Sequence, residues 1–183
     1  MLLSLAVKIK GSGYKPDVIV GVSRGGWPPA RIMSDLLENS RVANMRVEFY
    51  KDIGVRSKRP QITQPVTAEV AGKRVLVVDD VSDTGHSLKA ASNHLKRKKT
   101  REVRVCTIYM KPHSVFRPDF YERTTRKWII FPWERLEAVR LIAKRLGPGK
   151  AKLSTVTREL KDSGMSGRLV RQIWSVLHDD GRD

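Results

Sequence analysis

The sequence predicts an α/β fold in which a mostly parallel, twisted sheet is flanked by helices and followed by a small three-helix unit. Short apolar, β-branched runs alternate with stretches of helical spacing, which is the pattern of parallel strands joined by crossover helices. The run from Arg74 to Asp80 has the composition of a strand that is buried on both faces. From Glu134 onward, apolar residues recur only at helical spacing.

The first predicted elements are the end of a helix, a strand and a second helix. Residues 2–9 have helical character that is broken at the glycines of residues 11–13, and residues 17–22 form a strand. Pro28 or Pro29 opens the next helix, since proline suits the first helical turn. Its inward stripe is predicted to be Ile32, Met33, Leu36 and Leu37.

The middle of the chain supplies the remaining strands. Residues 51–65 are rich in proline and cations and have no period, so we expect a mobile basic loop that closes over a ligand. Residues 112–127 look irregular. Strands are predicted at residues 42–50, 74–80, 102–110 and 127–131, with a helix at 87–97.

The boundary between the two parts of the chain is predicted after residue 133, so that residues 1–133 form the sheet domain and residues 134–183 form an extension. Three helices are expected in the extension, and Ser166 is the expected N-cap of the last. About 50 residues in short helices bury little surface by themselves. We therefore expect the extension to dock on the sheet domain or on a second subunit.

The overall composition is that of a globular protein. The chain has 183 residues, 40% of them hydrophobic, and no apolar run long enough to span a bilayer. Residues 1–7 are too short for a signal peptide. The single cysteine, Cys106, lies in a predicted strand and excludes a disulfide within one chain. We therefore expect a cytoplasmic protein with no membrane partner.

The charge is strongly positive. The chain has 36 Lys+Arg and 19 Asp+Glu, a net +17, and such a field attracts polyanions such as nucleotides, diphosphates and nucleic acids. Residues 134–183 hold 11 Lys+Arg and 7 Asp+Glu, a net +4, so the charge is not a basic tail. The densest basic run, residues 96–101, is interpreted as the solvated end of a helix.

The most informative chemistry lies in residues 74–87. Asp79 and Asp80 follow the buried strand, at the edge where open α/β sheets bind ligands. The turn that ends in Asp83-Thr84-Gly85 offers backbone N–H groups to an anion at a helix N-terminus. Acids beside a phosphate site predict a phosphorylated ribose with a divalent metal. A receiver domain also ends a strand in paired acids, but the next strand here, residues 102–110, lacks the required aspartate at its end.

Four apolar residues followed by Asp-Asp-x-x-Asp-Thr-Gly resemble the phosphoribosyl-diphosphate (PRPP) motif of type I phosphoribosyltransferases. Residues 21–26 resemble the diphosphate loop of that family, and residues 110–112 resemble the base-recognition lysine segment of its 6-oxopurine enzymes. Residues 128–134 resemble the Trp-Ile-x-x-Pro-Trp-acid segment of microbial xanthine–guanine phosphoribosyltransferases. The resemblance covers about residues 14–134.

The resemblance implies a purine phosphoribosyltransferase of nucleotide salvage, which transfers the 5-phosphoribosyl group from PRPP to a purine base with Mg²⁺ and releases diphosphate. Asp79 and Asp80 would bind the ribose hydroxyls and the metal, and Asp83 would be the catalytic residue that manages the proton of the purine N7. Lys111, Trp128 and Ile129 would bind the base. The PRPP-binding residues implied are Ser23, Arg24, Gly25, Gly26, Asp79, Asp80, Val81, Ser82, Asp83, Thr84, Gly85, His86 and Ser87.

Several of these residues have structural alternatives. Asp83 could cap the following helix, a role compatible with its role in catalysis. Lys111 could instead be a surface lysine after a strand, and Trp128 could be a core residue. The role of Glu134 is left open, between metal contact and the start of a helix.

Two departures from the family bear on the substrate and the partners. The helix that usually precedes the first strand is nearly missing. The three-helix extension resembles that of some archaeal purine phosphoribosyltransferases, including an adenine-using branch. Lys111 favours a 6-oxopurine, with adenine as the second choice. The family is usually dimeric or tetrameric, so a homodimer is expected.

The alternative function is a PRPP-responsive, nucleic-acid-binding regulator on the same fold. A helix-turn-helix-like pattern in residues 155–177 and the charge of +17 motivate it. The net +4 of the extension and the apparently intact base site of Lys111 and Trp128 argue against it, so a nucleic-acid partner is not expected. The segment at Trp128 likewise disfavours an orotate or uracil enzyme.

Overall fold

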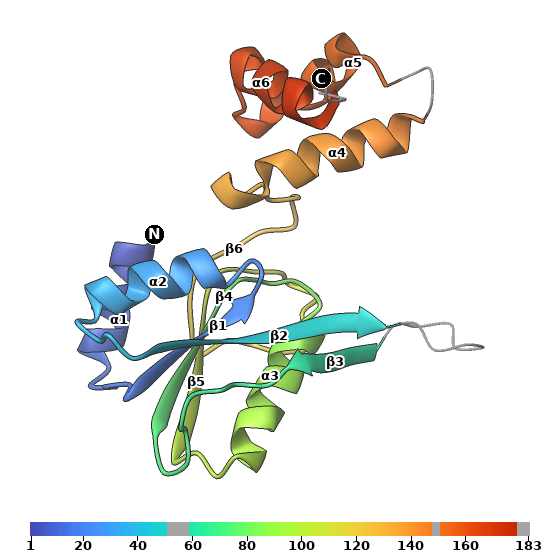
Figure 1. Cartoon of the computed structure of the whole chain (residues 1–183). Coiled ribbons are helices and arrows are strands. Elements are labelled where there is room, and N and C mark those ends of the chain that lie inside the picture. The colour runs from blue at the N-terminus through green and yellow to red at the C-terminus, as the bar shows by residue number, and fades with distance from the viewer. Residues whose placement is uncertain (51–58, 148–150, 179–183) are drawn as a thin grey trace. The chain divides into compact units, whose positions relative to one another are not determined.

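The computed structural model describes residues 1–50, 59–147 and 151–178. The chain divides into two compact units, Met1–Arg126 and Lys127–Asp183, and the boundary predicted from the sequence lies within the second of them. The first unit contains the sheet and the second contains three helices (Figure 1).

Six strands of the described residues form one sheet in the order β3-β2-β1-β4-β5-β6. Four of the five neighbouring pairs are parallel and only β2–β3 is antiparallel, so the predicted mostly parallel sheet is confirmed. The strands are β1 (Val18–Ser23), β2 (Val42–Tyr50), β3 (Arg59–Gln64), β4 (Arg74–Ser82), β5 (Glu102–Met110) and β6 (Phe120–Thr124).

Helices cover both faces of this sheet (Figure 1). The helices α1 (Leu2–Gly11) and α2 (Trp27–Leu36) pack on one face, and α3 (His86–Arg97) packs on the other. In β4, Val75 and Val77 belong to the core beneath α3, and the alternate residues Leu76 and Val78 belong to the core beneath α1 and α2. Burial on both faces explains why β4 reads as a continuous apolar run.

Two predictions about the sheet edges were wrong. The second half of the predicted loop, Arg59–Gln64, is β3, paired antiparallel with β2, while residues 51–58 lie outside the described residues. The strand after β5 is Phe120–Thr124, within the stretch predicted to be irregular, and residues 127–131 do not form a strand. β6 is held by pairing with β5 and by Asp119, whose Oδ2 accepts the backbone N–H of Val105 at 2.7 Å.

Two further corrections concern the first helices. The helix before β1 is not missing, because α1 has 10 residues and buries Leu5 and Ile9 completely. Ile32 is exposed rather than inward, whereas its neighbour Met33 is fully buried. Pro29, Ala30 and Met33 lie on the buried face of α2, and Ile32 lies outside that face.

The second unit contains the three predicted helices, α4 (Arg135–Leu146), α5 (Leu153–Glu159) and α6 (Gly167–His178). They pack around a small apolar core that includes Val139, Val156 and Val170, all fully buried. The predicted cap of α6 is confirmed, because the Ser166 Oγ accepts the backbone N–H of Leu169 at 3.2 Å. None of the described helices is both long and apolar enough to cross a membrane.

Candidate active site

The carboxyl ends of β1, β4 and β5 lie side by side at one edge of the sheet, because these strands are parallel neighbours. Asp79 and Asp80 lie near the end of β4 and are 9% and 6% exposed. The backbone N–H of Asp80 donates to the Asp79 Oδ1 at 3.0 Å. Successive residues of a strand point to opposite faces, so the two carboxylates leave β4 on its two sides. The edge therefore carries two nearly buried carboxylates, each with access to a different face.

The predicted diphosphate loop, Ser23–Gly26, lies directly against these acids. A Cβ added to Gly25 would be 2.8 Å from the Asp80 Cγ, closer than side chains approach one another. A Cβ added to Gly26 would be 2.7 Å from the carbonyl oxygen of Val22 and 2.9 Å from the Asp79 Cα. Glycine at both positions thus lets the loop reach the carboxylates. The peptide bond between Ser23 and Arg24 is cis.

The turn that joins β4 to α3 is shorter than predicted, because Val81 and Ser82 still belong to β4 and only Asp83, Thr84 and Gly85 lie between the two elements. Gly85 is the N-cap, with a left-handed φ of 81°, and no side chain caps the helix. The alternative in which Asp83 caps α3 is therefore wrong. Thr84 and His86 are exposed, so their side chains are accessible at the N-terminus of α3, the end of a helix that favours an anion.

The segment that follows β5 holds this turn in place. Lys111 donates its backbone N–H to the Ser82 carbonyl at 2.9 Å, and Val115 donates to the Thr84 carbonyl at 3.0 Å. The buried Ser82 Oγ lies 2.8 Å from the Ser114 Oγ and donates to the Phe116 carbonyl at 2.9 Å. The Ser82 hydroxyl thus supports the turn from beneath. Two backbone bonds and one side-chain bond hold the end of β4 and the following turn against the segment after β5.

Lys111 is 8% exposed, so the alternative of a surface lysine is wrong. It lies next to the end of β4, because Ser82 and Met110 are register partners. A nearly buried lysine at this edge brings a hydrogen-bond donor close to the carboxyl ends of the strands.

Sequence reasoning missed His113. Its Nε2 lies 3.4 Å from the Asp83 Oδ1, and both side chains are more than half exposed. The imidazole can donate a hydrogen bond to the carboxylate or exchange a proton with it. No local pattern in the sequence indicated this contact, because His113 lies in the turn after β5, far along the chain from Asp83.

Trp128 and Ile129 belong to the second unit. Trp128 is 60% exposed, so the alternative of core packing is wrong. With Ile129 and Ile130 it borders a hollow of about 80 Å³, to which Glu134 and Glu137 contribute carboxylates. The role of Trp128 and Ile129 in base binding stays a prediction.

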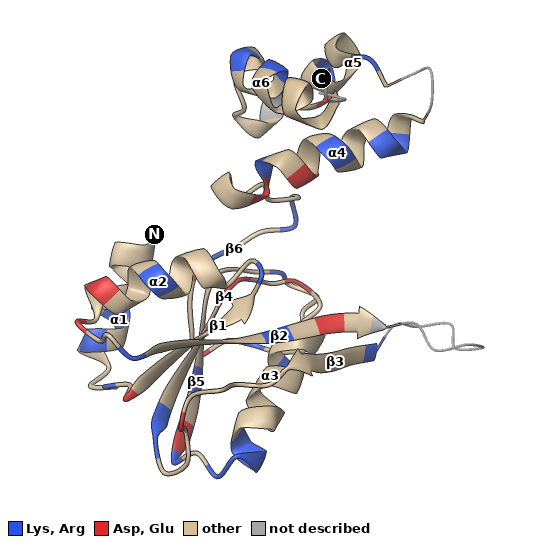
Figure 2. Cartoon of the chain, viewed as in Figure 1, with Lys and Arg blue, Asp and Glu red and all other residues tan. Residues whose placement is uncertain are grey.

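Other features of the first unit do not add to the candidate site. A larger hollow of about 660 Å³ lies at the amino-terminal edge of the strands, beside Tyr14 and Arg41, and contains none of the predicted site residues. Burial raises the pKa of the Cys106 thiol to about 12, so it is not a nucleophile. Lys and Arg are spread over both units rather than gathered in one patch (Figure 2).

Comparisons with known proteins match the first unit and the beginning of the second. The family model described as "Phosphoribosyl transferase domain" matches residues 3–135. The xanthine-guanine phosphoribosyltransferase of Idiomarina loihiensis is 34% identical over 118 residues, which are 63% of this chain and 70% of that protein. The enzyme of the same name from Cereibacter sphaeroides is 31% identical over 140 residues, 72% of this chain and 78% of that protein. A crystal structure of a purine phosphoribosyltransferase from Pyrococcus horikoshii is 40% identical, with a TM-score of 0.65, and covers 72% of this chain and 85% of its own.

Proposed function

Because the chain belongs to the phosphoribosyltransferase domain family, we propose that it is a purine phosphoribosyltransferase of nucleotide salvage, which joins the 5-phosphoribosyl group of PRPP to a purine base and releases diphosphate. One observation carries this proposal. The Asp79–Asp80 pair lies between the glycine loop before α2 and the open N-terminus of α3. Sites suited to diphosphate, ribose and a terminal phosphate thus adjoin one another in the order in which PRPP presents them.

The two carboxylates suit Mg²⁺. Their oxygens are the ligands that this hard cation prefers. The described residues contain no cluster of three or more His, Cys, Asp or Glu side chains, so a metal held by one of these carboxylates would complete its shell with substrate oxygens and water. Mg²⁺ would neutralise the diphosphate as it leaves. The carboxylates would also accept hydrogen bonds from the ribose hydroxyls.

Asp83 and Lys111 would act on the base. Displacement at the anomeric carbon passes through a cationic sugar, so the chain contributes positioning and charge rather than a covalent intermediate. The Asp83 carboxylate is exposed at the turn, so it can accept the hydrogen bond of the purine N7–H and hold that proton. His113, beside Asp83, would orient that carboxylate.

The nearly buried Lys111 supports a 6-oxopurine, because an ammonium donates to an O6 oxygen and repels the donor amino group of adenine. The named relatives act on xanthine and guanine, which agrees with this choice. Adenine remains the alternative, and the exposed ring of Trp128 is suited to stack on either base.

The test is product formation. The protein is incubated with PRPP, Mg²⁺ and one of xanthine, guanine, hypoxanthine or adenine, and nucleoside monophosphate is measured by chromatography. We expect nucleotide from at least one 6-oxopurine and its loss in the Asp79→Asn/Asp80→Asn variant. Absence of product from all four bases would overturn the proposal.

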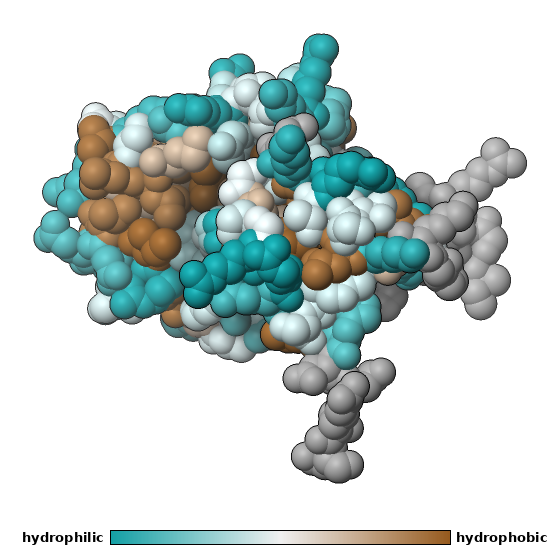
Figure 3. Space-filling view, turned by 90° about the horizontal axis from the view of Figure 1, so that it is seen from above, coloured by the Kyte–Doolittle hydropathy of each residue, from teal (hydrophilic) through white to brown (hydrophobic). Residues whose placement is uncertain are grey.

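We also propose that the protein is a homodimer. Leu3 and Val7 on α1 and Ile32 on α2 are exposed, and apolar surface gathers over these helices at one end of the face shown in Figure 3. Contiguous apolar surface of this kind is typical of an interface. Sedimentation velocity of the wild type and of Leu3→Ser/Val7→Ser tests this: a dimer that dissociates in the variant supports the proposal, and a monomeric wild type contradicts it.

A further inference from the structure

The family reaction leaves most of the second unit without a role. The family match ends at residue 135, where α4 begins. The three helices beyond it have their own apolar core. Three helices that share their own core and lie almost entirely beyond the family match call for a function of their own.

The second unit has the arrangement of a helix-turn-helix domain. Each of its three helices contacts both others. α5 and α6 are joined through a turn in which Gly164 adopts a left-handed φ of 78°, and Leu160 and Met165 at the ends of this turn are buried in the core. A turn containing glycine between two packed helices is characteristic of DNA-binding helix-turn-helix motifs. The connection here is longer than usual because it includes the 3₁₀ turn Lys161–Ser163.

The last helix, α6, has one buried and one exposed face. Val170 is fully buried, and apolar neighbours on that side pack against the core. Arg168, Arg171, Gln172 and Ser175 are exposed, and their spacing of three, four and seven residues from Arg168 places them on a single face. Arginine and glutamine are the side chains that most often form paired hydrogen bonds with guanine and adenine in the major groove.

The charge on this helix is of one sign. α6 contains no Asp or Glu, and its charged residues are Arg168 and Arg171. The net +4 of residues 134–183 conceals this, because three of the seven acids in that range lie at positions 179–183, beyond the end of α6. Figure 2 shows basic positions on α4 and α6. The exposed face of α6 is thus complementary to a polyanion.

We propose that the second unit binds double-stranded DNA, with α6 as the helix that enters the major groove through Arg168, Arg171 and Gln172. A helix of 12 residues is about 18 Å long and about 10–12 Å wide, which the major groove of B-DNA accommodates. The deep, narrow major groove of an RNA duplex does not admit it. The binding is independent of the transferase reaction.

The test is a titration of the full chain with a fluorescein-labelled mixed-sequence DNA duplex of about 30 base pairs, followed by anisotropy at several KCl concentrations. We expect Arg168→Ala/Arg171→Ala to weaken binding by at least about tenfold and to reduce the salt slope by about two. Lys96→Ala/Arg97→Ala is the matched control, because it removes the same charge from the exposed end of α3 in the first unit. It should change the affinity by less than about threefold.

Circular dichroism and the rate of nucleotide formation should be unchanged in both variants, which verifies folding. Equal losses in the two variants would mean that only the overall charge of +17 attracts DNA, and would overturn the proposal. So would stronger binding to a single strand or an RNA duplex of the same sequence, or no binding by the wild type at low salt.

Discussion

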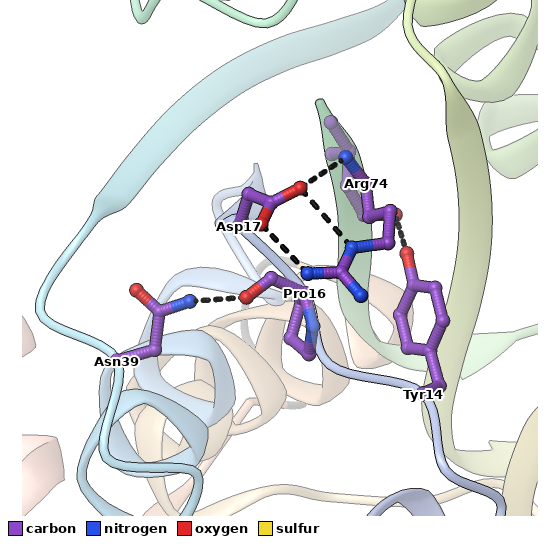
Figure 4. Close-up of polar contacts among 6 residues, drawn as sticks. Tyr14, Pro16, Asp17, Asn39 and Arg74 are labelled. Carbon is purple, nitrogen blue, oxygen red and sulfur yellow. Dashed lines mark hydrogen bonds and ion pairs between the residues drawn. The ribbon is translucent and has the colours of Figure 1, made fainter. Parts of the chain in front are cut away.

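The Asp17 carboxylate binds Arg74 at three points, across the first residues of two neighbouring strands (Figure 4). Its Oδ2 accepts the backbone N–H and the Nε of Arg74 at 2.8 and 3.2 Å, and its Oδ1 accepts Nη2 at 2.9 Å. Tyr14 Oη adds a bond to the Val75 carbonyl at 2.8 Å. Asp17 precedes β1 and Arg74 begins β4, so these bonds set the register of the two strands that end in the diphosphate loop and the acid pair.

The first prediction is that Asp17→Asn destabilises the protein in a pH-dependent way. Hydrogen bonds from Arg74 hold the pKa of the Asp17 carboxyl well below its usual range. The stabilisation is therefore complete above the pKa of an unfolded aspartate, about 3.9, and is lost as the pH falls from there through the lower value of the folded state. We expect the variant to lose about 1–2 kcal/mol in free energy of unfolding at pH 7, measured by urea denaturation.

The difference between wild type and variant should be as large at pH 5 as at pH 7 and should shrink below about pH 4. Glu38→Gln is the control, because Glu38 pairs with Lys10 on the surface and an exposed pair contributes little. A difference that stayed constant down to pH 2 would contradict the role of the Asp17 charge.

The second prediction is that two adjacent glycines differ in role, one in stability and the other in PRPP binding. A Cβ at Gly26 would meet backbone atoms of Val22, Val78 and Asp79, which cannot move without disturbing the sheet, so Gly26→Ala should lower the melting temperature by several degrees. A Cβ at Gly25 would instead meet the Asp80 side chain, which can rotate away. Gly25→Ala should keep most of the stability and lose PRPP binding, measured by calorimetry with Mg²⁺. Undiminished PRPP binding by Gly25→Ala would show that Asp80 need not face this loop.

The sequence predicts those parts of the fold and of the candidate site that depend on residues close together in the chain. Most of β4 was predicted correctly, because burial on both faces leaves a continuous apolar run, although the strand continues beyond the predicted end, through Val81 to Ser82. The position of β6 was not predicted, because its polar residues are extended only through pairing with β5. The contact of Asp83 with His113 joins residues far apart in the sequence, and neither local pattern nor spacing indicates it.

The third prediction concerns Asp83. Asp83→Asn keeps the shape of the side chain but cannot take up the base proton, so we expect turnover to slow by more than about tenfold while PRPP affinity stays within about twofold. Steady-state kinetics and calorimetry measure the two quantities. His113→Gln, which keeps a hydrogen-bond donor beside Asp83, should have a smaller effect than Asp83→Asn. Unchanged turnover in Asp83→Asn would remove this residue from the mechanism.

The last prediction concerns Trp128, whose ring is largely exposed. Because the ring is not part of the core, Trp128→Ala should leave the melting temperature almost unchanged. If the ring stacks on the base, its removal should raise the KM for the purine by about fivefold to a hundredfold, since stacking of a base on an aromatic ring contributes about 1–3 kcal/mol. The KM for PRPP should not change. Trp128→Phe, which keeps an aromatic face, should restore most of the affinity for the base, and a Trp128→Ala enzyme with an unaltered purine KM would place the base elsewhere.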